Sequence, residues 1–407
     1  MGFRKMRADI VIVGAGIMGL TMALESKKKF PHLHVLILEK EIEVALHASG
    51  RNSGVLHAGF YYSADSLKAK FCREGNFYMK KFCEDESIRI NSCGKLVVVK
   101  NEAELKVLEE LYQRGIKNGV TLSLINEEEV SKINPLVRTY KKAIYSSTSA
   151  VVSPREVTLT LKKKLQDLGV EFKFNSEVEH LDIKNKTIKT LQENIHYKYL
   201  INCAGMYADK IAAYFGLGLE YVLVPFKGIY LGYDSEIPSK LNLNIYPVPN
   251  LLNPFLGVHY TIKSDGSIKI GPTAIPCLSR ENYTFWGGIK LKEFLEISYY
   301  LGKMLLKNSE NMRSLAFQEM LKYNKKIMQS LIQYMAPEVD VTRFTKVLPP
   351  GIRPQLITRK DLRFVQDFQF RETENSLHLL NAISPAFTCS FAISKYLVEK
   401  IEFKNEF

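Results

Sequence analysis

The amino-acid sequence predicts an α/β protein with a Rossmann-like domain and a second, α+β domain built on an antiparallel sheet. Three observations support this prediction. The chain has 407 residues, more than a single hydrophobic core usually holds. Its N-terminal residues follow a strand, glycine turn, helix and strand pattern. Residues 221–275 instead alternate short β-runs with proline and glycine turns, as antiparallel strands do.

Composition limits the class of protein. A hydrophobic content of 46% and a charged content of 24% are typical of a globular protein. The net charge of +13 favours an anionic ligand, an anionic membrane surface or nucleic acid, although solvated lysines account for most of it. The six cysteines have no CxxC spacing, so we expect reduced thiols and neither a metal site nor a disulfide framework.

The N-terminus carries a pattern that resembles a signal peptide. Arg4, Lys5 and Arg7 precede an apolar run at residues 10–24, but Asp9 and three glycines interrupt the pattern. No other stretch reaches the roughly 20 apolar residues that a membrane span needs. We therefore expect a cytoplasmic protein, with peripheral contact to the inner face of a membrane as an open alternative.

The interrupting glycines are better explained as a nucleotide-binding turn. Residues 10–13 are apolar and β-branched, as a buried parallel strand would be. Gly14, Gly16 and Gly19 follow in GxGxxG spacing, which allows a tight turn, close approach of a pyrophosphate to a helix N-terminus, and close packing of helix on strand. Glu39 ends a second strand 20 residues after Gly19, where a carboxylate can bind ribose hydroxyls. The motif predicts an ADP-containing cofactor, either NAD or FAD.

The loop that follows distinguishes these two cofactors. Residues 46–62 read LHASGRNSGVLHAGFYY, which has too much glycine for a helix and too many polar groups for a core strand. Such a segment can pass beneath the isoalloxazine ring of FAD, because its glycines permit close backbone approach. Ser49, Arg51, Asn52 and Ser53 offer hydrogen bonds to phosphate and to flavin heteroatoms. The loop therefore favours FAD.

Ten blocks of this sequence match one known family in the same order. They are NSGVLHAGFYY (52–62), SLKAKFCREGN (66–76), CGKLVV (93–98), LINCAGMYAD (200–209), VPFKGIY (224–230), IYPVPN (245–250), PFLGVHY (254–260), GPTA (271–274), PPGIRPQ (349–355) and NAISPAFTCSFAI (381–393). Through them the chain resembles the D-amino-acid-oxidase superfamily of flavoproteins and, within it, the L-2-hydroxyglutarate oxidase/dehydrogenase family. The resemblance covers nearly the whole chain. It implies FAD, held covalently or not, and oxidation of a 2-hydroxy acid.

Some residues depart from the family pattern. The family usually has arginine where this chain has Lys227, and PAGVRAQ where it has PPGIRPQ. It usually has NAPSPAATSS where this chain has NAISPAFTCS, so Ile383, Phe387 and Cys389 are atypical. These departures bear on substrate preference more than on flavin binding.

The remaining elements follow from periodicity and from turn residues. The charged, amphipathic residues 102–118 suit a solvent-facing helix. The turn 153–155 starts another helix with proline in its first turn. A further strand is expected at 199–203, and the chain should end in a closing helix at 386–403.

Two domains are expected from this arrangement, and the antiparallel sheet should cover the flavin and hold the substrate. Residues 286–335 are predicted to be helical, with eight lysines and arginines against four glutamates. A basic amphipathic stretch can lie on an anionic bilayer, although such helices more commonly pack on their own domain. The predicted FAD-binding domain comprises residues 1–90, 145–215 and 340–407, and the substrate-binding domain comprises residues 91–144 and 216–339.

Oxidation of a 2-hydroxy acid has three requirements: C2–H facing flavin N5, an acceptor for the hydroxyl proton, and fixed cations for the carboxylates. Arg353 is the best anchor, because its planar fork can hold a carboxylate with two hydrogen bonds. Each such bond is worth about 1.5–3 kcal/mol, so loss of both should weaken binding at least a hundredfold. Lys227 is the second predicted cation, a point charge rather than a fork.

Two histidines compete for the role of base, since imidazole titrates near neutral pH. We favour His57, which follows the flavin loop directly, over His259, and a hydrogen-bonded core histidine is the alternative for either. Tyr246, Thr388 and Ser384 are further candidates for contacts with the substrate.

The predicted cofactor site extends beyond the glycine motif. Some flavoproteins of the superfamily tether FAD through a histidine in a similarly placed loop, so the resemblance raises a covalent bond to His47, with phosphate or core contact as the alternative. The predicted cofactor-binding residues are Gly14, Gly16, Gly19, Glu39, Lys40, His47, Ser49, Arg51, Asn52, Ser53, Gly54, Ala204, Gly205, Gly351, Pro385, Ala386 and Thr388.

The leading functional hypothesis is FAD-dependent oxidation of L-2-hydroxyglutarate, or a closely related 2-hydroxy dicarboxylate, to the 2-oxo acid by hydride transfer to flavin N5. Oxygen or a quinone-linked acceptor would then reoxidise the flavin. An amine or amino-acid oxidase on the same fold is the alternative, but two cationic anchors favour a dicarboxylate. A basic RNA-associated flavoprotein is a third hypothesis, which only the net charge supports, because the chain has no arginine-rich or RNP-like element.

Overall fold

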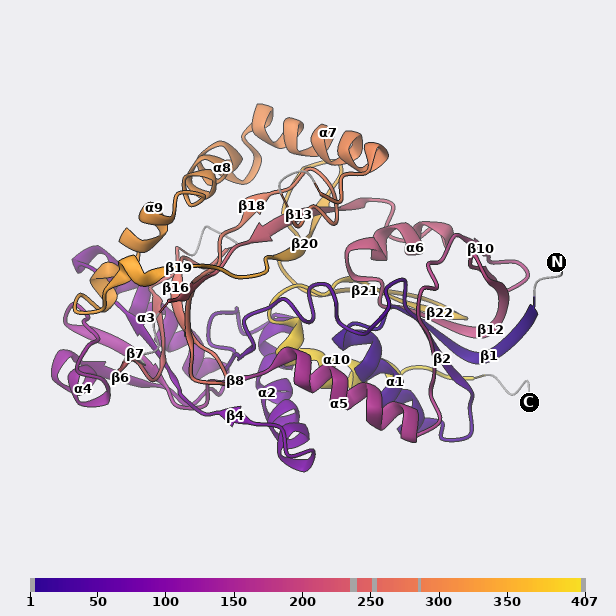
Figure 1. Ribbon diagram of the computed structural model, residues 1–407, viewed down its shortest axis with the longest axis horizontal. Helices are drawn as coiled ribbons and strands as arrows, with labels where there is room; N and C mark the ends of the chain where they lie inside the picture. The colour runs from indigo at the N-terminus through magenta and orange to yellow at the C-terminus, as the bar shows by residue number, and fades with distance from the viewer. Residues whose placement is uncertain (1–3, 235–239, 251–254, 285–286, 404–407) are drawn as a thin grey trace.

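The computed structural model describes residues 4–234, 240–250, 255–284 and 287–403. In this part of the chain, two eight-stranded sheets lie toward opposite ends of an elongated molecule, and two three-stranded sheets complete the strand order (Figure 1). The predicted α/β class, with a Rossmann-like sheet and a largely antiparallel second sheet, is confirmed.

The first large sheet is the Rossmann-like sheet. Its strands are β1 (Arg4–Val13), β2 (Val35–Leu38), β9 (Glu171–Lys173), β10 (His180–Asp182), β11 (Thr187–Lys189), β12 (Glu193–Asn202), β21 (Gln369–Thr373) and β22 (Ser376–Asn381). The central strand β1 pairs in parallel with β2 and β12, and β12 pairs in parallel with β22. Ile10, Val11 and Ile12 have no exposed surface, because both faces of β1 are covered.

Five helices pack around this sheet: α1 (Ile17–Lys29), α2 (Leu67–Asp85), α5 (Pro154–Asp167), α6 (Ala208–Tyr214) and α10 (Ala386–Val398). Helix α1 packs between α5 and α10, and α10 also contacts α2, while α6 contacts β12 and β22. The predicted helix at the turn 153–155 is α5. The Ser153 hydroxyl caps it by accepting a hydrogen bond from the Glu156 N–H at 3.3 Å.

The closing helix is shorter than predicted. It was expected to reach Phe403, but α10 ends at Val398. The ammonium group of Lys29, at the end of α1, donates hydrogen bonds to the carbonyl oxygens of Val398, Glu399 and Ile401 at 3.2, 2.8 and 2.8 Å. A distant lysine therefore satisfies the last carbonyl groups and lets the chain leave the helix.

The second large sheet has eight strands: β5 (Lys95–Val98), β6 (Ser123–Asn126), β7 (Lys142–Ser146), β14 (Leu231–Tyr233), β15 (Asn244–Pro247), β16 (His259–Ile262), β17 (Ile268–Gly271) and β19 (Phe344–Val347). All neighbouring pairs are antiparallel except β5 with β15. Two further helices belong to this region, α3 (Glu102–Lys117), which is the helix predicted at 102–118, and α4 (Glu127–Ile133).

The remaining described strands form two sheets of three strands each. One contains β13 (Tyr221–Gly228), β18 (Ile275–Pro276) and β20 (Gly351–Thr358), and the other contains β3 (Val55–Leu56), β4 (Ile90–Asn91) and β8 (Ala150–Val152). The antiparallel register of β13 and β20 sets Phe226 opposite Arg353. The division into two domains stays a prediction. Strands β19 and β20, both after residue 340, pair with β14 and β13 respectively.

Three helices form the predicted helical stretch: α7 (Leu291–Lys307), α8 (Met312–Leu321) and α9 (Lys325–Ser330). Residue 286, the first of that stretch, lies outside the described residues. Figure 1 shows α7 and α8 along the upper edge of the molecule, above β13 and β18. No described helix is both long enough and apolar enough to cross a membrane. The 3-10 turns are η1 (Gly205–Tyr207), η2 (Ser309–Asn311), η3 (Gln333–Met335) and η4 (Val341–Arg343).

Candidate active site

A cavity of about 520 Å³ lies where the Rossmann-like sheet meets the sheet of β13 and β20. Gly14, Gly16 and Glu39 border it from the β1–α1–β2 unit, and Tyr230 and Arg353 border it from the second half of the chain. Most of the predicted cofactor residues border it, and only Gly19 and Gly54 do not. Those that do are Gly14, Gly16, Glu39, Lys40, His47, Ser49, Arg51, Asn52, Ser53, Ala204, Gly205, Gly351, Pro385, Ala386 and Thr388.

The glycine turn at the start of α1 has no room for side chains. Gly14 has a φ of +103°, and a Cβ there would lie 2.5 Å from the Cys203 carbonyl oxygen. A Cβ at Gly16 would lie 2.9 Å from the Ser49 hydroxyl oxygen. At Gly19, away from the cavity, it would lie 1.9 Å from the Gly14 carbonyl oxygen, so this glycine lets α1 pack against the turn. The bare backbone and the helix N-terminus fit a pyrophosphate.

Glu39 is fixed at the carboxyl end of β2. Its two carboxylate oxygens accept hydrogen bonds from the Ala15 N–H at 2.7 Å and from the Glu41 N–H at 3.0 Å. The side chain is buried but borders the cavity, in the position where a ribose would follow the pyrophosphate. The Ser49 hydroxyl accepts the Ile17 N–H at 2.9 Å and so attaches the loop to the first turn of α1.

The loop at residues 46–62 is held mainly by its own hydrogen bonds. Arg51 Nε donates to the Leu46 carbonyl at 2.7 Å, and Asn52 Nδ2 donates to the Ser49 carbonyl at 2.7 Å. A Cβ at Gly351 would lie 2.3 Å from the Arg51 carbonyl oxygen, so β20 starts directly against the loop. Several of the polar groups expected to bind flavin therefore first fix the shape of the loop.

His47 lies in a polar cluster at the Glu39 end of the cavity. Its Nδ1 bonds to the Tyr283 hydroxyl at 2.7 Å and its Nε2 to a Glu41 carboxylate oxygen at 2.8 Å. Burial, followed by the charge of Lys40, lowers the pKa of His47. The covalent flavin bond to His47 stays a prediction, and these contacts leave neither ring nitrogen free.

The same cluster has the spacing of a metal site, because ligand atoms of Glu41, His47 and Glu281 lie within 4.8 Å of one another. The ammonium group of Lys40 already contacts both carboxylates, Glu41 at 3.4 Å and Glu281 more closely. Both carboxylates of this cluster are therefore already paired with a lysine cation.

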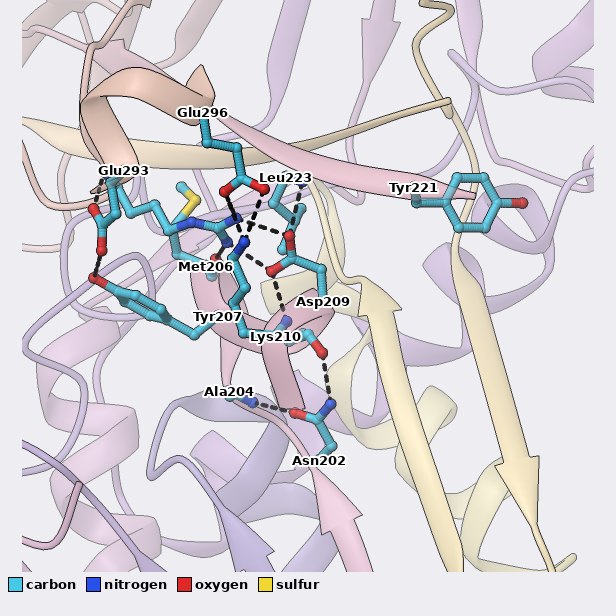
Figure 2. A network of polar contacts seen from close by, with 12 residues as sticks. Asn202, Ala204, Met206, Tyr207, Asp209, Lys210, Tyr221, Leu223, Glu293 and Glu296 are labelled. Atoms are coloured by element: carbon cyan, nitrogen blue, oxygen red, sulfur yellow. Dashed lines mark hydrogen bonds and ion pairs between the residues drawn. The ribbon is translucent and has the colours of Figure 1, made fainter. Parts of the chain in front are cut away.

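A buried ion pair fastens the loop at residues 280–283 to η1 and α6 (Figure 2). The guanidinium of Arg280 donates to the two carboxylate oxygens of Asp209 at 2.6 and 2.8 Å and also to the Met206 carbonyl. Below it, the Asn202 side chain accepts the Ala204 N–H at 3.1 Å. The network holds the turn at Ala204 beside the cavity. Arg280 was not singled out from the sequence, because its partner is 71 residues away.

The opposite end of the cavity contains His57. Its backbone N–H donates to the Thr388 hydroxyl at 3.2 Å, and its Nδ1 has no hydrogen-bond partner among the described residues. Burial lowers the pKa of His57 well below its usual value, and the charges of Lys95, His259 and other nearby cations lower it further. The imidazole is therefore neutral at pH 7 and able to accept a proton.

Arg353 borders the same end of the cavity, and its guanidinium has no hydrogen bond or ion pair to any residue that the structure describes. Its guanidinium carbon lies 5.0 Å from the centre of the Phe255 ring, which offers the cation only its π face. Burial lowers the pKa of this guanidinium. An arginine with unused donors on a cavity wall is arranged to bind an anion. Ser384 borders the cavity as well.

Three predicted substrate residues do not border the cavity. Lys227 donates to the Thr284 carbonyl at 3.2 Å, on the face of β13 opposite to Phe226. The ring of Tyr246 stacks on His259, with centroids 3.7 Å apart, and His259 Nδ1 bonds to the Gly257 carbonyl at 2.7 Å. Burial lowers the pKa of His259 to about 3. Their predicted roles stay predictions, and the geometry favours His57 as the base.

Two buried lysines near this end were not predicted. Burial, followed by the charge of Arg353, lowers the pKa of Lys68 to about 8. Burial lowers the pKa of Lys95 to about 7, and this ammonium lies 4.1 Å over the Tyr246 ring without a hydrogen-bond partner among the described residues. The sequence does carry a sign of Lys68, because a lysine on the apolar stripe of a helix indicates a buried charge. Lys68 shares the buried face of α2 with Cys72, four residues later.

Comparison with known proteins gives one family and several relatives. The profile of the DAO family, described as FAD dependent oxidoreductase, matches residues 9–400. The chain is similar to the L-2-hydroxyglutarate dehydrogenase of Escherichia coli strain K12, at 34% identity over 97% of this chain and 93% of that protein. It is also similar to the mitochondrial L-2-hydroxyglutarate dehydrogenase of Homo sapiens, at 34% identity over 98% of this chain and 89% of that protein.

Solved structures show the same fold. The FAD-bound L-alpha-glycerophosphate oxidase of Mycoplasma pneumoniae aligns with a TM-score of 0.77 and 22% identity, over 98% of this chain and 95% of that one. The glycine oxidase of Geobacillus kaustophilus aligns with a TM-score of 0.71 and 18% identity, over 98% of this chain and 96% of that one.

Proposed function

The chain belongs to the DAO family of FAD-dependent oxidoreductases, and on that premise we propose that it oxidises L-2-hydroxyglutarate, or a closely related 2-hydroxy dicarboxylate, to the 2-oxo acid. The observation that carries the proposal is the Arg353 guanidinium on the cavity wall, which has no ion pair among the described residues and lies close to the buried cation of Lys68, while the buried Lys95 lies near His57. A monoanionic substrate would leave most of this charge uncompensated. Among the described residues, the cavity wall beside Arg353 has no carboxylate, and a dicarboxylate substrate would supply two negative charges there.

Each residue at this end has a defined task in the proposed reaction. Arg353 binds one carboxylate through its planar fork and so fixes C2 of the substrate. Lys68, which lies near Arg353, raises the positive potential that attracts the second carboxylate. His57, neutral at pH 7, accepts the proton of the C2 hydroxyl as the C2–H bond breaks. When bound, FAD supplies the acceptor for the hydride.

The resulting imidazolium would lie in a strongly cationic environment, so the proton must leave His57 before the next turnover. Among the described residues, its Nδ1 has no partner that would hold the proton. The same charges that lower the pKa of His57 therefore favour release of the proton once the product departs.

An amine or amino-acid oxidase on the same fold is the alternative function. Anaerobic mixing of the FAD-loaded protein with L-2-hydroxyglutarate should bleach the flavin absorbance, and mixing with glycine or with neutral L-amino acids should not. Bleaching by the amino acids alone would reverse this ranking and would reject the proposed substrate class.

Oxygen or a quinone-linked acceptor would take up the two electrons removed from the substrate, and the protein would act in the cytoplasm, with peripheral contact to a membrane. Oxygen consumption during turnover, compared with reduction of a soluble quinone, distinguishes the two acceptors.

A further inference from the structure

The exposed apolar side chains of this molecule are concentrated in one segment. Twelve of the 21 large apolar side chains that are exposed among the described residues lie between residues 278 and 331. That segment is a small part of the chain, so the clustering is far from an even scatter of single exposed residues. Contiguous apolar surface of this kind on a globular protein marks a contact site.

Helix α7 carries two apolar stripes rather than one. Its inner stripe, centred on Ile297 and Met304, packs against Val222 and Val224 of β13 and is buried. Packing on its own domain therefore uses this stripe completely. The outer stripe consists of Leu291, Leu295, Tyr299 and Leu306, which are 72%, 59%, 54% and 78% exposed.

The outer stripe is continuous along the helix. Positions i, i+4, i+8 and i+15 fall on one side of an α-helix, so these four side chains point the same way. Helix α8, which contacts α7, extends the surface with Phe317 and Met320, 66% and 54% exposed. Figure 1 shows both helices along the same outer edge. Nothing in the described chain covers this edge.

The charges around the stripe are one-sided. Three of the four glutamates between residues 287 and 335 are turned inward to partners: Glu293 to Ser279, Glu296 to Lys210 and Arg280, and Glu319 to Lys322. The basic residues remain at the surface. Those that are exposed are Lys290, Lys292, Lys307, Arg313, Lys325 and Lys326.

We propose that the outer face of α7 and α8 docks on an anionic lipid bilayer. The exposed leucines and aromatic rings would enter the interfacial region of the bilayer, and the surrounding lysines would lie at the level of the anionic headgroups. A second copy of the chain fits this face less well, because a symmetric pair would bring two sets of lysines together. The attachment is peripheral, since no described helix has the length and hydropathy of a membrane span.

Docking would also bring the cavity close to the bilayer. The loop that borders the cavity with Arg280, Glu281 and Tyr283 leads directly into α7, and Leu278 and Ile289 on either side of it are exposed. The inference does not depend on the substrate, because it rests only on the exposure and charge of this face.

The test is flotation of the FAD-loaded protein with lipid vesicles. Vesicles of phosphatidylcholine mixed with phosphatidylglycerol should carry the wild type upward, and vesicles of phosphatidylcholine alone should carry far less of it. The variant Leu291→Gln/Leu295→Gln/Leu306→Gln/Phe317→Gln should lower the partition coefficient by roughly thirtyfold or more, because four apolar insertions are lost.

A control with the same residue types uses exposed side chains elsewhere on the molecule. The variant Phe77→Gln/Leu168→Gln/Leu191→Gln/Leu219→Gln also removes three leucines and one phenylalanine, which are 62%, 43%, 74% and 58% exposed in that order. It should float like the wild type. Both variants should keep the thermal midpoint of the wild type, because none of these side chains is buried.

A variant with fewer lysines separates the electrostatic contribution to vesicle binding from the apolar contribution. Lys290→Gln/Lys292→Gln/Lys307→Gln should reduce binding to the anionic vesicles about tenfold and leave binding to phosphatidylcholine unchanged. A wild type that does not float, or an α7–α8 variant that floats like the control, would overturn the proposal. Analytical ultracentrifugation that shows a dimer of the wild type and a monomer of the α7–α8 variant would also overturn the proposal, because the face would then bind a second copy of the chain.

Discussion

The two ends of the cavity are built in opposite ways. At the Glu39 end, nearly every polar group has a protein partner: Glu39 holds two backbone N–H groups, His47 uses both ring nitrogens, and Lys40 contacts two carboxylates. At the Arg353 end, the half-buried Arg353 and the buried Lys68 and Lys95 have no ion pair with any residue that the structure describes.

The difference shows what each end is built to receive. The Glu39 end keeps its shape without a ligand and offers a preformed backbone surface to the cofactor, which lowers the ordering cost of binding. The Arg353 end holds cations that only the fields of Asp367 and Glu319 offset among the described residues, which is unfavourable in the free protein and becomes favourable when a dianion binds. Variants at the two ends should therefore differ in kind, with changes at one end affecting cofactor affinity and changes at the other affecting turnover.

The largest expected effect is that of Arg353→Met. Loss of two charge-assisted hydrogen bonds should lower kcat/KM for L-2-hydroxyglutarate at least roughly a hundredfold. FAD affinity should stay unchanged, and the thermal midpoint should stay the same or rise, because a half-buried cation with no ion pair among the described residues is removed. Anaerobic flavin reduction and thermal unfolding measure these effects. Arg363→Met, at an exposed arginine, is the control. A loss of less than fivefold would remove Arg353 from the site.

The second prediction uses pH to measure the burial of His259. In the unfolded chain this histidine takes up a proton near pH 6.5, whereas the folded protein does not bind it until about pH 3. Stability therefore falls as the pH falls below about 6.5, by about 2 kcal/mol per such histidine on reaching pH 5. His259→Gln should remove that part of the dependence in denaturant unfolding at the two pH values. His180→Gln, at an exposed histidine, should leave the dependence intact, and an unchanged slope in the His259 variant would contradict the burial.

Cofactor affinity should respond to Glu39→Gln. The amide has one acceptor oxygen where the carboxylate has two, so one of the two backbone hydrogen bonds is lost together with the charge. The FAD dissociation constant should rise about tenfold. The kcat of the variant measured at saturating FAD should change less than twofold. Flavin fluorescence quenching gives the affinity, and Glu179→Gln, at an exposed glutamate, is the control. A variant that binds FAD like the wild type would show that Glu39 only supports the turn.

The smallest effect is expected for Lys68→Met. This lysine acts through the potential around Arg353 rather than through a direct contact, so KM for the dicarboxylate should rise about fivefold with kcat nearly constant. Raising the ionic strength should shrink the difference between variant and wild type. A fall in kcat without a change in KM would instead give Lys68 a role in the chemical step.

The sequence predicts the Glu39 end well, for a physical reason. Gly14, Gly16 and Glu39 lie within one βαβ unit, where short-range spacing fixes the geometry. Backbone turns of this kind need particular residues, so the residues reveal the turn. The loop after Glu39 packs against the same unit and is predicted with it.

The Arg353 end is assembled from distant segments, and the sequence predicts it less completely. Lys68, Lys95 and Arg353 come from α2, β5 and β20, and no spacing rule connects them. Lys227 shows a second limit. Its neighbours Phe226 and Gly228 border the cavity, so the alternation of β13 turns Lys227 to the opposite face. The family block VPFKGIY indicates that the strand is present, but a shift of one residue decides which side chain the substrate meets.

The most direct test of the account compares two substrates that differ only in the second carboxylate. Anaerobic reduction of the bound flavin should be at least roughly a hundredfold more efficient, in kcat/KM, with L-2-hydroxyglutarate than with L-2-hydroxypentanoate, because the second negative charge meets the buried cations around Arg353. Equal efficiency with both acids would contradict the assignment of that end of the cavity to a dicarboxylate.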